Sequence, residues 1–176
     1  SIADRKNNWG TWGCYSSLLI YHYLDDTIGF NKISKMIEKS IPQMIRHDGF
    51  LPEEVKRKGG GLGYTHFAMT SLTASLNVIN NLTGQNLFYK EFEGIYLIER
   101  ALDTLFYYCN NPGKWPHFQP LRSLPYTGGW PFELFLAMRN VYPYRYIQSQ
   151  EIYLKASKQQ CSWFYPQLFY PSIEKN

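Results

Sequence analysis

Arg57 and Tyr64 are the residues whose types and spacing most directly suggest chemistry. They lie in the stretch GFLPEEVKRKGGGLGYTHFAM, residues 49–69, on either side of the consecutive glycines at 59–61. Glycines allow a backbone to turn sharply and to pass close to a polymer. A guanidinium beside a phenol suits proton transfer next to a carboxylate, because the cation neutralises negative charge while the phenol exchanges protons.

This combination fits β-elimination at a 4-linked uronate. The C5 proton of such a sugar is poorly acidic while the neighbouring carboxylate is charged, so donors or cations must neutralise that carboxylate and stabilise the enolate-like intermediate. A base takes the proton and an acid protonates the leaving C4 oxygen. In mannuronate and glucuronate both events occur on one face of the ring, so one tyrosine can perform both. Nearby positive charge must lower the reference pKa of a tyrosine, ~10, for it to act as the base.

Composition is compatible with one folded domain that binds an acidic partner. The chain has 176 residues, 44% hydrophobic, 18% charged and 18% aromatic, with a formal net charge of +4. These values indicate neither disorder nor a membrane span. Positive charge with exposed rings suits acidic polysaccharide or nucleic acid, but no nucleic-acid-binding motif is present. The cysteines, at positions 14, 109 and 161, form no CxxC pair and predict neither a zinc site nor a disulfide framework.

Apolar residues at helical spacing predict an all-α fold. The apolar stripes cover residues 15–22, 33–45, 68–79, 95–109 and 130–141, and a sixth helix is expected over 146–157. Pro42 is expected to kink or split the second helix, and Gly84 to end the third. Tyr64 stands at the start of the third helix. The aromatic segment 110–129 is long enough to predict a functional loop.

Three motifs resemble the alginate lyase family. Residues 49–69 match the family's GFLP, acid pair, basic run and Leu-x-Tyr at a helix start. NNWGTW at 7–12 is similar to the family's Asn-Asn-His-Ser-aromatic-Trp, and GGWPFEL at 128–134 is similar to a late helix start. The resemblance implies an (α/α) toroid and a polysaccharide lyase that cleaves alginate (polymannuronate) or glucuronan by syn β-elimination. It also implies no metal or other cofactor, an acidic polysaccharide substrate without nucleic-acid or membrane partners, and a periplasmic or secreted location.

The resemblance assigns roles residue by residue. Tyr64 would be the acid and base, while Arg57 and Asn8 would neutralise the substrate carboxylate. Trp9 stands where the family has histidine, so the indole is expected to change a sugar subsite. The remaining candidates for substrate binding are Asn7, Lys58, His66, His117 and Trp130.

Each assignment competes with a structural interpretation. Tyr64 could be a core tyrosine at a helix start, and Arg57 part of a solvated charge run. Asn8 could cap the helix that follows it, and a structural role is favoured for His66. Glu53 and Glu54 could suggest a glycosidase acid/base pair. Adjacent carboxylates point in different directions, however, so ion pairs that fix the loop are expected.

Two other functions compete with a lyase. One is a non-catalytic toroid remnant that binds acidic glycan, and the other is a glycoside hydrolase on a similar helical toroid. A toroid of this family needs about twice the helices counted here. Residues 1–176 are therefore expected to form a single all-α domain that is the C-terminal half of a larger toroid, with the N-terminal half as its partner.

Overall fold

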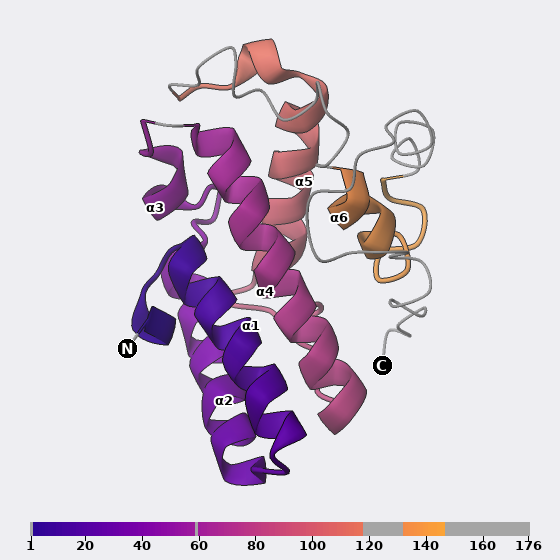
Figure 1. The fold of residues 1–176 in the computed structure, drawn as a ribbon. Coiled ribbons are helices and arrows are strands. Elements are labelled where there is room, and N and C mark those ends of the chain that lie inside the picture. Colours follow the sequence, from indigo (N-terminus) through magenta and orange to yellow (C-terminus); the bar gives the residue numbers. More distant parts are fainter. Residues whose placement is uncertain (1, 59, 118–131, 147–176) are drawn as a thin grey trace.

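The computed structural model of the protein describes residues 2–58, 60–117 and 132–146 (Figure 1). In these ranges the chain is helical and contains no β-strand, only an isolated bridge between Phe92 and Ile95. The elements are η1 (Ile2–Asp4), α1 (Asn8–Tyr23), α2 (Thr27–Met44), α3 (Pro52–Val55), α4 (Gly61–Thr83), α5 (Leu97–Asn110), η2 (Pro112–Lys114) and α6 (Phe132–Met138). The predicted all-α class is confirmed, and the toroid stays a prediction.

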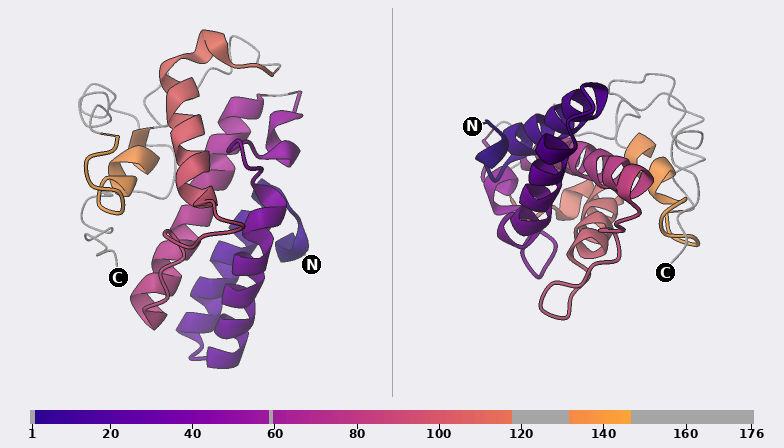
Figure 2. Two further views of the ribbon diagram at one scale, coloured as in Figure 1. Left: turned by 180° about the vertical axis from the view of Figure 1, so that it is seen from behind. Right: turned by 90° about the horizontal axis from the view of Figure 1, so that it is seen from below.

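The long helices alternate in direction. Helices α1 and α2 form an antiparallel hairpin, α4 packs against α1, and α5 packs against α4 (Figures 1 and 2). Because α4 is covered on several sides, most of its residues as far as Ile79 are buried. None of the described helices combines the length and apolarity needed to cross a membrane.

The apolar stripes of the sequence correspond to helices α1, α2, α4 and α5. Pro42 does not split α2, because it lies near the C-terminal end of the helix, which stops at Met44. Gly84 ends α4 as predicted, in the left-handed conformation with φ of 74°. The stripe at 130–141 contains α6, while the helix expected over 146–157 lies outside the described residues.

The one-turn helix α3 was not predicted, since a single turn is too short to show periodicity. Its sequence nevertheless has the signals of a helix start. Pro52 occupies the first helical position, and Glu53 and Glu54 lie in the first turn. A proline at that position has a suitable φ, and acids there interact favourably with the helix dipole.

Helix α1 begins in close contact with the segment that precedes it. A Cβ atom built on Gly10 would lie 1.8 Å from the carbonyl oxygen of Arg5, which is backbone and cannot rotate away. Glycine at position 10 therefore allows the first turn of α1 to pack against residues 2–6. This turn carries Asn8.

Replacing Gly10 with alanine should destabilise the protein by about 3 kcal/mol, the upper part of the range for overpacking. The matched control is Gly113→Ala in η2, where an added Cβ would have no atom within 4 Å. Urea unfolding of both variants measures the difference. Equal unfolding midpoints would show that the contact at Gly10 relaxes without cost.

Candidate active site

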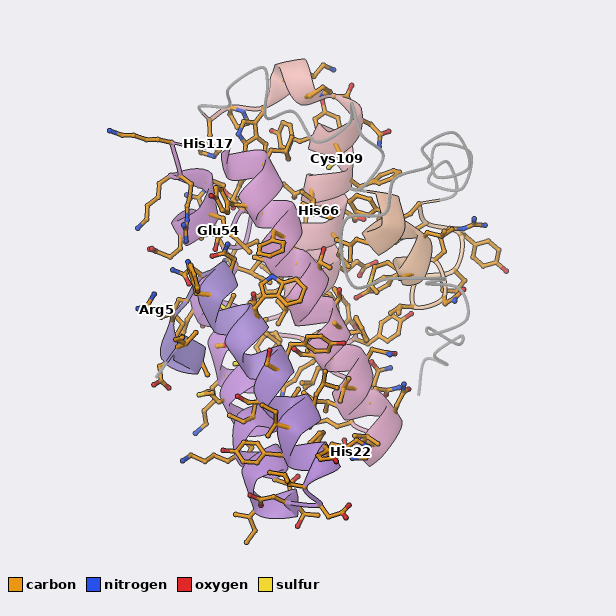
Figure 3. The ribbon with its side chains drawn as sticks, viewed as in Figure 1. Arg5, His22, Glu54, His66, Cys109 and His117 are labelled. Carbon is orange, nitrogen blue, oxygen red and sulfur yellow. The ribbon has the colours of Figure 1, made fainter. Side chains whose placement is uncertain are left out.

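Three segments of the chain meet beside α3, between the N-terminal ends of α1 and α4 (Figures 1 and 3). Arg57, just after α3, donates from Nη2 to Oδ1 of Asn8 on α1 at 3.1 Å. Its guanidinium carbon also lies 4.8 Å from the centroid of the Tyr64 ring on α4. The predicted approach of Arg57 to Tyr64 is confirmed. Together with Glu54, these residues form what we call the Arg57 cluster: Asn8, Glu54, Arg57 and Tyr64.

The glycines allow the chain to return from α3 to α4. Gly60 has a φ of 132°, a conformation that residues other than glycine rarely adopt. A Cβ on Gly61 would lie 2.8 Å from the carbonyl oxygen of Val55, so α4 starts in contact with the end of α3. The backbone N–H of Tyr64 donates to the carbonyl oxygen of Gly60 at 3.0 Å, which places Tyr64 in the first turn of α4.

Glu54 is the buried acid of the cluster. It is 0% exposed and lies between α3 and α1 (Figure 3). Its Oε1 accepts the backbone N–H of Asn8, and its Oε2 lies 3.4 Å from Nε of Arg57. Burial raises the pKa of Glu54, while the hydrogen bond from Asn8 and the charge of Arg57 act in the opposite direction. The carboxylate thus contacts two of the predicted catalytic residues.

The N-cap of α1 is Asn7, and the interpretation of Asn8 as the cap is wrong. Oδ1 of Asn7 accepts the backbone N–H groups of Trp9 at 3.1 Å and Gly10 at 3.4 Å. Asn8 is the first helical residue and is buried. Because Asn7 satisfies the helix end, the amide of Asn8 is available to Arg57. The predicted contact of Asn7 with substrate stays a prediction.

Exposed side chains lie next to the Arg57 cluster, in which Asn8 and Glu54 are buried while Arg57 and Tyr64 are half-buried. Trp9, next to Asn8, is 56% exposed, and Lys58 is exposed beside Arg57. Glu53 pairs with Lys56 at 2.6 Å on the surface, whereas Glu54 pairs with Arg57 inside. The two acids therefore have different partners. The prediction that both form ion pairs is confirmed, and their role in fixing the loop stays a prediction.

The other candidates lie in different surroundings. His66 is only 3% exposed, which agrees with the structural role favoured for it. His117 packs edge-on against Phe50, with ring centroids 5.1 Å apart, and against Trp115 at 5.4 Å. It therefore belongs to an aromatic group beside the start of α3. Trp130 lies outside the described residues.

No metal-binding cluster was identified in the described part of the chain. Across residues 2–58, 60–117 and 132–146, no group of three or more His, Cys, Asp or Glu side chains is placed to hold a metal ion. Cys14 and Cys109 are buried free thiols, and burial raises the pKa of Cys14 to about 11. Neither thiol is therefore suited to act as a nucleophile or metal ligand at neutral pH.

In this helical protein one guanidinium contacts both an amide and a phenol, which are groups that can neutralise an anionic substrate and exchange protons. The sequence model of the family described as alginate lyase matches residues 2–115, a range that includes the whole Arg57 cluster. The chain belongs to the alginate lyase family, and this membership indicates a polysaccharide lyase. Comparisons with curated proteins and with solved structures gave no match.

Proposed function

We propose that the protein cleaves a 4-linked polyuronate, alginate (polymannuronate) or glucuronan, by syn β-elimination, with Tyr64 as both base and acid. The observation that carries the proposal is that Arg57 contacts Asn8 and the Tyr64 ring at the same time. A carboxylate bound by Arg57 and Asn8 would therefore lie next to the phenol. Such an arrangement would favour proton removal at the adjacent carbon.

The amide of Asn8 has a defined orientation for this task. Arg57 has only donors, so Asn8 must present its oxygen to the guanidinium. The NH₂ group of the same amide is then the group left to donate to a substrate carboxylate. Asn8 and Arg57 would together neutralise that carboxylate, and their effect would grow as negative charge develops in the transition state.

The reaction needs one proton shuttle. Tyr64, as phenolate, takes the C5 proton, and the electron pair of the C5–H bond is stabilised by the neutralised carboxylate. That pair then forms the C4–C5 double bond as the bond between C4 and the glycosidic oxygen breaks. Tyr64 returns the proton to the leaving oxygen and is ready for another cycle. The products are a new reducing end and a 4,5-unsaturated uronate.

The geometry disfavours a glycoside hydrolase built on the acid pair. Glu54 is fully buried and Glu53 is paired with Lys56, so neither is free to protonate a glycosidic oxygen. A non-catalytic glycan-binding protein could use the exposed Trp9 and the cations, and it remains the alternative. Because the proposed substrates are extracellular polymers, we place the protein in the periplasm or outside the cell, which cell fractionation would test.

An activity panel tests the proposed function. Purified protein is incubated with polymannuronate, polyguluronate and glucuronan, and the ultraviolet absorbance of the unsaturated uronate is followed. We expect absorbance to rise with polymannuronate or glucuronan, because in these sugars the C5 proton and the leaving C4 oxygen lie on the same face of the ring. Binding to all three polymers without a rise in absorbance would favour the glycan-binding alternative.

Trp9 is expected to set the preference among these polymers. Its large exposed ring offers a flat face for stacking on a sugar, where the histidine of related sequences would offer donors and charge. We expect glucuronan to be preferred, and Trp9→His to raise activity on polymannuronate relative to glucuronan several-fold, within the range of one stacking contact.

The matched control for Trp9→His is Tyr23→His, which also replaces an exposed aromatic residue of α1, but at the opposite end of the helix. Both variants and the wild type are assayed on both polymers. If Trp9→His leaves the ratio of activities on the two polymers unchanged, Trp9 does not determine the substrate preference. The same conclusion follows if the wild type already prefers polymannuronate.

A further inference from the structure

Glu54 is a buried charged group that the proposed reaction does not use. Its side chain is fully inaccessible to solvent, although it comes from a helix of only one turn. Its two oxygens face different elements, one towards the backbone of Asn8 in α1 and the other towards the side chain of Arg57. It therefore connects two residues that the reaction does use.

We infer that Glu54 is the positioning residue of this site: it fixes Arg57 against the first turn of α1, so that Arg57 and Asn8 meet the substrate carboxylate together. The inference rests on the proposed function and adds a role for a residue that cannot itself touch the polymer. Glu54 acts only through its neighbours, because none of its surface is exposed.

The contacts of Arg57 explain why such a residue is needed. An arginine side chain has many rotamers, and fixing it costs conformational entropy. Glu54 faces its Nε, Asn8 accepts from its Nη2, and the ring of Tyr64 lies against the guanidinium. These contacts hold Arg57 in place before substrate arrives, so the entropy cost is met on folding and not in the transition state.

Stability alone does not account for a charge at this position. Removing a carboxylate from water is unfavourable, and the burial that raises the pKa of Glu54 outweighs the opposing effects of Asn8 and Arg57. Replacing a buried ion pair with neutral groups of similar shape is often neutral or stabilising. Glutamine keeps the size of Glu54 and an oxygen for the N–H of Asn8, but it loses the attraction to Arg57.

Glu54→Gln and Glu53→Gln form a matched pair of variants for the test. The neighbouring acid Glu53 pairs with Lys56 at the surface, so the same chemical change there should leave catalysis unaltered. We expect Glu54→Gln to lower kcat about tenfold or more, as misplacement of catalytic groups does. KM should change little, because the binding surface is retained. The melting temperature should fall, because removing one partner of a buried ion pair destabilises a protein, so kcat is compared at equal folded fraction. Glu53→Gln should match the wild type in all three.

A double-variant cycle tests whether Glu54 works through Arg57. In an Arg57→Ala background, adding Glu54→Gln should cause no further loss of kcat/KM, because the residue to be positioned is gone. A purely structural role would instead add its full loss in either background. Glu54→Asp, which keeps the charge but shortens its reach, should retain more activity than Glu54→Gln if charge is the main requirement.

These experiments distinguish failure of the positioning role of Glu54 from failure of the proposed lyase function. If the wild type forms unsaturated product and Glu54→Gln behaves like Glu53→Gln, the positioning role is overturned while the proposed function stands. It is likewise overturned if activity in Glu54→Gln and Glu54→Asp falls only in proportion to the folded fraction, measured by circular dichroism. If the wild type forms no unsaturated product from any polyuronate, the proposed function fails and the positioning role fails with it.

Discussion

Replacing Tyr64 with phenylalanine should lower turnover by about 10²-fold or more, the low end of the range for general acid–base catalysis. The substitution removes the hydroxyl that exchanges protons and keeps the ring. Since Arg57 lies against that ring, the guanidinium should remain in place. Binding of the polymer should therefore survive, and the loss should appear in kcat more than in KM.

Tyr15→Phe is the matched control for this variant. Tyr15 is half-buried, as Tyr64 is, but it lies on α1 and packs edge-on against Trp12. Initial rates of unsaturated product and polymer affinity are measured for both variants. Near-normal turnover in Tyr64→Phe would show that Tyr64 is not the proton shuttle, whatever the binding data show.

Replacing Arg57 with lysine should remove most of the activity, on the order of 10²-fold, comparable to losing one preorganised donor to a developing anion. Lysine keeps the charge but lacks the planar fork of arginine. It cannot face Glu54, donate to Asn8 and cover the ring of Tyr64 at once, as the guanidinium does.

An exposed arginine of α5 provides the control for Arg57→Lys. Arg100 lies at the surface outside the Arg57 cluster, so Arg100→Lys makes the same exchange there and should leave the rate unchanged. Initial rates of unsaturated product are measured for both variants and the wild type. If Arg57→Lys keeps the rate of the wild type, Arg57 is a surface charge and the carboxylate must be neutralised elsewhere.

The helices were largely predictable, because their apolar stripes are long and regular. The stripe at 95–109 predicted α5 to within two residues at each end, and Gly84 marked the end of α4. Helix α3 could not be found in this way, since one turn gives no periodicity. Pro52, followed by two acids, is the local signal that would have located it.

The site was predictable where the signal was local and was missed where it depended on packing. Arg57 and Tyr64 are close in sequence, and the glycines between them indicated that the chain folds back. The sequence left open which asparagine caps α1, because Asn7 and Asn8 have the same capping propensity. Glu54 is buried against Asn8, which is 46 residues away in the sequence. No pattern within residues 49–69 predicts this contact.

We propose that this protein breaks its polymer by elimination. The direct measurement follows the chromophore and the new reducing ends together in one digest of the preferred polyuronate, with Tyr64→Phe as the comparison, and determines product masses. We predict that absorbance rises in proportion to the new reducing ends and that each new non-reducing terminus is lighter by one water than a hydrolysis product. New reducing ends without the chromophore, carrying the mass of hydrolysis products, would contradict the claim.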